Sequence, residues 1–266
     1  ESAMARLIPL FSGSSGNSYY IGTKEAGILI DAGRSAKQLT EMLRTCDIDP
    51  LAVQGIFITH EHNDHVSGLR VFASKYNIPV FGSVGTMDAL CAMNINNGSF
   101  AASYMEDDLQ IADMTVNAFR TSHDCAESCG YRVKTADGKI ITLATDLGCL
   151  SERVCENLLG SDYVIIESNH DIRMLETGGY PYPLKRRILS DYGHLSNKAC
   201  SEFLPKLQKS GTRKFMLAHL SSENNTPDLA YQTSLCSMVV GGLVKDQDFI
   251  LNVAPKANLK GINIIF

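Results

Sequence analysis

Short apolar runs alternate with longer amphipathic stretches along the whole chain. The short runs are rich in β-branched and aromatic residues and are bounded by polar or glycine-containing turns, which is typical of strands. We expect strands over residues 6–11, 18–22, 27–31, 54–59, 79–81, 114–120, 130–134, 140–145, 163–167, 214–219 and 249–253. The longer stretches repeat apolar residues at helical spacing and predict helices over residues 36–45, 65–76, 151–159, 196–207 and 227–240. Strands that alternate with helices in this way indicate mixed α/β layers.

The composition is that of an ordinary globular protein. The 266 residues are 44% hydrophobic and 20% charged, and we expect a single domain over residues 1–266. No apolar run approaches the roughly 20 residues that span a bilayer. The N-terminal residues also lack the charged-then-apolar pattern of a secretory signal. We therefore expect a cytoplasmic protein without a membrane partner, in which the eight cysteines are reduced thiols.

The charge balance bears on the class of substrate. A net charge of −5, from 24 basic and 29 acidic side chains, argues against broad attraction to polyanions. A nucleic-acid enzyme could still concentrate positive charge locally, and bound metal ions would add their own. The only tight basic triplet is 185–187 (Lys-Arg-Arg), which fits either a solvated helix face or such a local contact.

The most distinctive polar cluster, THEHNDH at 59–65, directly follows an apolar run. If the strand extends through His62, then His60 and His62 project from one face, because extended side chains alternate. Asp64 and His65 then open the next helix and face the same pocket. This arrangement can supply ligands to two adjacent metal ions. The alternative is a polar turn whose histidines cap a helix, but His-x-His-x-Asp-His is far more specific than any pair of histidines.

Five motifs in this order make the sequence similar to the metallo-β-lactamase superfamily. They are ILIDAG at 28–33, the cluster around His60, His123 in TSHD, Asp146 in LATD and His219 in MLAHL. Three further strings resemble the bacterial YycJ/WalJ-type hydrolases, described as exodeoxyribonucleases: SGSSGN at 12–17, ESNHD at 167–171 and GHLSN at 193–197. The resemblance covers nearly the whole chain. It implies a four-layer αββα sandwich with helices outside two facing sheets and metals at one edge.

The resemblance also implies a centre of two divalent metal ions, with zinc or manganese favoured over iron, nickel or magnesium. The implied ligands are His60, His62 and His123 for the first ion, Asp64, His65 and His219 for the second, and Asp146 as a bridge. A metal-bound hydroxide would attack the substrate, and Asp64 would additionally orient it. Phosphodiesterases of the superfamily commonly have aspartate at the fourth motif, whereas members that open β-lactams commonly have cysteine.

Glu167 and His194 resemble a pair found in the RNase Z branch, where the histidine protonates the leaving alkoxide and the carboxylate orients its ring. For His194 the alternative is a turn residue that precedes a helix. Asp31 is expected to hydrogen-bond the ligands or nearby backbone rather than bind metal.

Three further residues are candidates for contacts with substrate. Ser14 and Asn17 lie in the glycine-containing 12–17 loop, whose backbone N–H groups could face a phosphate, although a tight turn between two strands fits equally well. His170 fits either a place in the site or local packing.

The leading hypothesis is a dinuclear metal phosphodiesterase, most consistent with a DNA exonuclease that uses metal-bound hydroxide. The runner-up is a small-molecule hydrolase, either a cyclic phosphodiesterase or a lactonase, which the negative net charge favours. A third hypothesis is a regulatory binding protein with a vestigial site. Only 47 residues separate Asp146 from His194, which leaves no room for the large inserted domain of RNase J-type relatives. No long glycine- and proline-rich arm is visible either, which favours nucleic-acid ends or small phosphodiesters over structured RNA.

Overall fold

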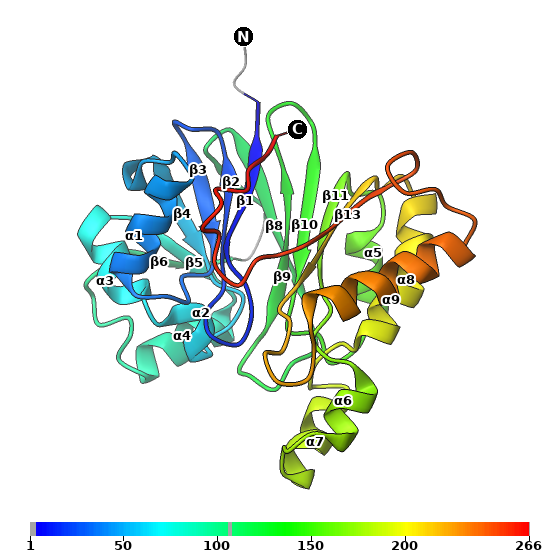
Figure 1. Cartoon of the computed structure of the whole chain (residues 1–266). Coiled ribbons are helices and arrows are strands. Elements are labelled where there is room, and N and C mark those ends of the chain that lie inside the picture. The colour runs from blue at the N-terminus through cyan, green and yellow to red at the C-terminus, as the bar shows by residue number, and fades with distance from the viewer. Residues whose placement is uncertain (1–3, 106–107, 266) are drawn as a thin grey trace.

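Two mixed β-sheets face each other in the computed structural model of the chain, which describes residues 4–105 and 108–265 (Figure 1). Within these residues each sheet has seven strands. The first has the order β14-β1-β2-β3-β4-β5-β6 and the second the order β13-β12-β11-β10-β9-β8-β7. Antiparallel pairs occupy one side of each sheet and three parallel pairs the other.

The strands of the first sheet are β1 Arg6–Phe11, β2 Ser18–Gly22, β3 Gly27–Ile30, β4 Val53–Phe57, β5 Val80–Gly82, β6 Ala102–Tyr104 and β14 Ile264–Ile265. Those of the second are β7 Leu109–Ile111, β8 Met114–Arg120, β9 Cys129–Lys134, β10 Ile140–Ala144, β11 Tyr163–Glu167, β12 Lys214–Ala218 and β13 Ile250–Val253. The helices are α1 Ala36–Thr45, α2 Asn63–Val66, α3 Leu69–Tyr76, α4 Val84–Ala92, α5 Glu152–Leu158, α6 Ile172–Thr177, α7 Tyr182–Ile188, α8 Asn197–Lys209 and α9 Pro227–Val240, with a short 3-10 turn at Pro50–Ala52.

Helices cover the outer face of both sheets, which confirms the expected αββα sandwich. Helices α1, α3 and α4 lie on the first sheet, and α5, α8 and α9 on the second (Figure 1). Side chains such as Ile30, Phe57, Tyr131 and Ile165 fill the space between the sheets and are fully buried. Burial of this kind contributes roughly 25 cal/mol for each Å² of apolar surface removed from water.

The predicted strands are present, with ends that differ by a few residues. Three short edge strands, β6, β7 and β14, were not predicted because each has only two or three residues. Helices α5 and α8 begin where expected, after Ser151 and Ser196, whose hydroxyls accept hydrogen bonds from backbone N–H groups in the first turn. Helices α4, α6 and α7 were not predicted.

Around the THEHNDH cluster, the condition set for the strand is not met and the helix prediction is wrong. Strand β4 ends at Phe57 and does not continue through His62, because Asp31 accepts the Thr59 N–H at 2.8 Å in place of a strand neighbour. The helix predicted over residues 65–76 is broken into α2 and α3. The break occurs at Gly68, where an added Cβ would lie 1.8 Å from the Arg34 carbonyl oxygen. The backbone at residue 68 passes so close to the Arg34 carbonyl that only glycine fits.

Further expectations can be compared with the described residues. All eight cysteines are free thiols, as expected. Within residues 4–105 and 108–265, no helix is both long enough and apolar enough to cross a membrane. Helices α6 and α7 extend beyond the end of the sheets at which α2 also lies (Figure 1).

Candidate metal centre

The candidate ligands are brought together at the carboxyl ends of parallel strands in both sheets. Asp31 follows β3, Asp146 is two residues beyond β10, and His219 follows β12. All three have left-handed backbone conformations, with φ of 62°, 57° and 54° respectively. This conformation costs roughly 1–2 kcal/mol for a residue with a Cβ. At each strand end it turns the chain sharply where the candidate ligands cluster.

The loop after β3 lies very close to the candidate ligands at Gly33. A Cβ at Gly33 would lie 1.7 Å from the Asp64 carbonyl oxygen. The Asn17 N–H donates to that same oxygen at 2.8 Å, and the Gly33 N–H donates to the Asn17 carbonyl at 2.9 Å. The glycine of ILIDAG therefore lets three distant segments meet beside Asp64.

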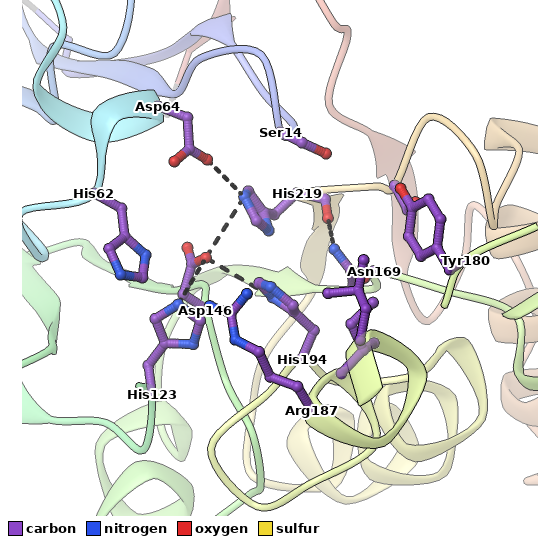
Figure 2. A pocket seen from close by; sticks show the side chains of 13 residues that line it. Ser14, His62, Asp64, His123, Asp146, Asn169, Tyr180, Arg187, His194 and His219 are labelled. Atoms are coloured by element: carbon purple, nitrogen blue, oxygen red, sulfur yellow. Dashed lines mark hydrogen bonds and ion pairs between the residues drawn. The ribbon is translucent and has the colours of Figure 1, made fainter. Parts of the chain in front are cut away.

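Two groups of candidate ligands face each other in this space. His60, His62 and His123 form the first, with ring centroids 4.6–5.1 Å apart. Asp64, His65 and His219 form the second, and within each group the ligand atoms lie within 4.8 Å of one another. Figure 2 shows His62, Asp64, His123 and His219 arranged around Asp146.

Asp146 lies between the two groups. Its Oδ2 is 3.3 Å from His65 Nε2, and its Oδ1 is 3.8 Å from His123 Nε2 and 3.5 Å from His219 Nε2. A single carboxylate that faces histidines of both groups has the position required of a bridging ligand.

Buried hydrogen bonds hold the Nδ1 atoms of three candidate ligand rings. Thr59 Oγ1 lies 3.1 Å from His60 Nδ1, and Asp31 Oδ2 lies 2.7 Å from His65 Nδ1. The Gly193 carbonyl is 3.0 Å from His123 Nδ1. With Nδ1–H donating outward, the Nε2 lone pairs face the shared space, which is the tautomer that a metal requires. Asp31 therefore has the supporting position expected from the sequence.

Glu167 is fully buried and holds two histidines at once. Its Oε1 lies 2.8 Å from His194 Nδ1 and 2.9 Å from His219 Nδ1. Its Oε2 accepts the backbone N–H groups of Leu147 and Leu195. The sequence predicted the link from Glu167 to His194 but not the link to His219. Through these two bonds Glu167 connects the candidate proton donor, His194, with a candidate metal ligand, His219.

The donor set fits a cation. His60 Nε2 and Asp146 Oδ2 are buried and have no hydrogen-bond partner among the described residues. Buried polar atoms almost always have partners, so a cation between them would satisfy both. Imidazole nitrogens combined with carboxylate oxygens suit first-row divalent metals.

The metal-free cluster carries protons that a cation would replace. Burial opposes charge on His65 and His219, but Asp146 and the other carboxylates outweigh it. They raise the pKa of His65 well above its usual value and the pKa of His219 to about 10. Burial, together with the neighbouring imidazoles of His65 and His123, lowers the pKa of His60. Metal binding to such a site must release protons.

A cavity of about 270 Å³ opens onto the cluster. Ser14, a candidate for contact with substrate, and His194, the candidate general acid, both line it. Asn17 and His170 do not line it, and their exposed fractions are only 1% each. Asn17 Oδ1 instead accepts the Gly13 N–H at 2.9 Å, which stabilises the turn that carries Ser14. Burial argues against direct contact of Asn17 or His170 with substrate.

The sequence did not single out the other wall of this cavity. Tyr180, Leu184 and Arg187, from α7 and the segment before it, line the cavity. Figure 2 shows Arg187 across the cavity from Ser14. Arg187 belongs to the basic triplet, and its guanidinium donates to Asp124 Oδ1 at 2.9 Å. Lys185 from the same triplet instead donates to backbone carbonyls of the segment between α6 and α7. One member of the triplet thus faces the site, and only the packing of α7 reveals which.

Comparisons with known proteins agree with this geometry. A family model described as the beta-lactamase superfamily domain matches residues 27–220. The chain is 38% identical over 223 residues to "Exodeoxyribonuclease YycJ" of Bacillus anthracis, an alignment that covers 83% of this chain and 84% of the relative. It is 36% identical over 244 residues to "Exodeoxyribonuclease WalJ" of Streptococcus pneumoniae, with 90% of both chains covered.

A solved structure shares the fold at much lower identity. The metallo-beta-lactamase fold protein YhfI from Bacillus subtilis superposes with a TM-score of 0.73 at 12% identity, over 99% of this chain and 100% of that protein. The fold, the ordered motifs and the identity to relatives over most of the chain lead to one assignment. The chain belongs to the metallo-β-lactamase superfamily, within the family of the YycJ and WalJ exodeoxyribonucleases.

Proposed function

We propose that this chain is a dinuclear metal-dependent phosphodiesterase that removes nucleotides from the ends of DNA. The observation that carries the proposal is that the seven candidate ligands cluster at one cavity, which His194 also lines, with Glu167 buried behind His194. The relatives named as exodeoxyribonucleases support DNA as the substrate class. A cytoplasmic location would follow from such a substrate and stays a prediction.

The proposed ligands of the two metal ions are the two groups of side chains described above. His60, His62 and His123 would hold one ion, Asp64, His65 and His219 the other, and Asp146 would bridge both, with zinc or manganese favoured. Two bound divalent cations would polarise the phosphorus–oxygen bond and produce a nucleophile from water at neutral pH.

The chain's own side chains supply the remaining steps. His194 lines the cavity and would protonate the leaving oxygen, while buried Glu167 holds its ring and favours the protonated form. Asp64 would also orient the attacking nucleophile. Arg187 would bind a non-bridging phosphate oxygen, because a guanidinium provides paired donors for such an anion.

A small phosphodiester is the second candidate substrate, favoured by the net charge of −5. The two candidates differ in their response to salt. Binding of DNA through several phosphates weakens steeply as salt concentration rises, whereas binding of a substrate with one phosphate changes little.

The activity can be tested with 5′- and 3′-labelled linear DNA and with circular single-stranded DNA, in the presence of manganese or zinc. We expect progressive loss of nucleotides from linear DNA and no cleavage of the circle, which has no end. His62→Ala should reduce the rate about 100-fold or more, since loss of residues that merely support ligands already costs 10–100-fold. Equal activity in the wild type and this variant would contradict the proposed centre.

The role of His194 can be tested through the leaving group. General acid catalysis contributes roughly 10²–10⁴-fold, so His194→Gln should lose that much activity on DNA. A p-nitrophenyl ester of thymidine monophosphate has a leaving group that needs no proton, and the variant should hydrolyse it nearly as fast as the wild type. An equal loss on both substrates would refute the assignment of His194 as the acid.

A further inference from the structure

A second cavity of about 190 Å³ lies beside the one that opens onto the metal centre. Ser14 and Ser221 line both cavities, so the two adjoin across these residues. The second cavity is formed by the β1–β2 loop, the segment after β12, the start of α9 and Lys256 beyond β13. The proposed chemistry at the metal centre does not use this second cavity.

The polar groups of this cavity are available to a ligand. Among the described residues, the hydroxyls of Ser14 and Ser222 and the ammonium of Lys256 make no hydrogen bond or ion pair. All three residues are exposed. Hydroxyls and an ammonium group are the donors that proteins commonly direct at sugar–phosphate backbones.

The cavity is held in a fixed position relative to the metal centre. The backbone N–H of His219 donates to Ser12 Oγ at 2.9 Å, so the β1–β2 loop is tied to a candidate ligand. On the other side, Asn225 Nδ2 donates to the carbonyls of Ser168 and Asn169 at 2.9 and 3.0 Å. A ligand bound here would therefore sit in a defined register with a phosphate at the metal centre.

We infer that this cavity, lined by Ser14, Ser222 and Lys256, binds the sugar–phosphate of the nucleotide next to the scissile phosphodiester. The inference rests on the proposed function and narrows its substrate to a strand of at least two linked nucleotides. A small phosphodiester would occupy only the catalytic cavity. It would not reach the second cavity or its Lys256 ammonium group.

The test compares a substrate that extends as a nucleotide strand beyond the scissile bond with one that does not. One is a single-stranded oligonucleotide, and the other is the p-nitrophenyl ester of thymidine monophosphate, which fills only the catalytic cavity. Lys256→Ala removes the cation, and Ser222→Phe fills the cavity. Lys260→Ala and Ser99→Phe are matched controls, because both residues are exposed and line neither cavity.

We expect Lys256→Ala and Ser222→Phe to raise KM for the oligonucleotide about tenfold and to leave KM for the ester unchanged. Lys256→Ala should also reduce the slope of log affinity against log salt by about one, the signature of one lost phosphate contact. If Lys256→Ala and Ser222→Phe show the same oligonucleotide kinetics as the control variants, the inference is overturned while the proposed function stays intact. If the wild-type protein loaded with manganese or zinc hydrolyses neither substrate, the proposed function fails and the inference fails with it.

Discussion

Asp31 offers a sharp test of how the buried hydrogen bonds prepare the metal centre. Its carboxylate is 1% exposed and accepts from the Thr59 N–H and hydroxyl, each at 2.8 Å, and from His65 Nδ1 at 2.7 Å. In Asp31→Asn an NH₂ group takes the place of one oxygen and faces His65 Nδ1. The ring must then accept at Nδ1 and carry its proton on Nε2, the atom that would bind metal.

The expected magnitude follows from the number and charge of these bonds. Loss of one hydrogen bond to a charged group costs about 1.5–3 kcal/mol, which corresponds to roughly 10–100-fold in affinity for the second metal ion. The fold should persist, because asparagine has nearly the same shape and tolerates the left-handed backbone at φ 62°. Burial raises the pKa of Asp31, so its charge is costly to bury, and a neutral side chain should lower metal-free stability little.

The assay is metal content by mass spectrometry after gel filtration, competition with a chromophoric chelator, and thermal unfolding. Asp113→Asn is the matched control, since Asp113 also has a left-handed backbone, with φ 58°, and is exposed. Asp31→Ala should bind metal more weakly than Asp31→Asn and should unfold at a lower temperature. It leaves buried donors without an acceptor, and alanine tolerates the left-handed backbone less well than aspartate or asparagine does, a combined cost on the order of 4 kcal/mol. Wild-type affinity for both metals in Asp31→Asn would refute the argument.

Three further predictions follow from the site. Metal binding near pH 7 should release protons from His65 and His219, whose pKa values are raised, so affinity should fall as pH falls. Calorimetry in buffers of different ionisation enthalpy would measure the release, and identical heats would contradict it. Arg187→Ala should raise KM for DNA about tenfold by removing a charge-assisted phosphate contact. Arg186→Ala makes the same charge change outside the cavity and should leave KM unchanged in steady-state kinetics. Burial lowers the pKa of His170 from 6.5 to about 4, so stability present above pH 6.5 should be lost as pH falls toward 4. That loss amounts to about 3 kcal/mol. His170→Gln should flatten this dependence in denaturant titrations, and an unchanged slope would exclude His170 as its source.

The candidate ligands were identified from the sequence because each lies just after a short apolar run. Such runs are recognisable strands, and the carboxyl ends of parallel strands share an edge, so motifs far apart in the chain could be expected to meet. The spacing of His60, His62, Asp64 and His65 added specificity. The geometry that brings them together is different from the expected one, since β4 stops at Phe57 and the chain turns within the cluster.

Other features could not be predicted because they depend on packing between distant segments. Asn17 and His170 have the right chemistry for substrate contact, but the fold buries both. Arg186 and Arg187 are indistinguishable in the sequence, and only the way α7 packs turns Arg187 toward the cavity. The second bond of Glu167, to His219, likewise joins the last residue of β11 to the residue that follows β12, and the sequence does not specify the register of these adjacent strands.

The sequence alone determined the class of fold, most of the strands and the identity of the side chains able to hold metal. Local hydrophobic periodicity and short motifs encode these properties, and they survive errors of a few residues in an element's ends. Only the tertiary structure decided which polar residues face the cavity, which rings are held by buried acceptors, and where a second cavity adjoins the first. Those properties arise from contacts between segments far apart in the chain, and a one-residue change in register is enough to reverse the direction of a side chain.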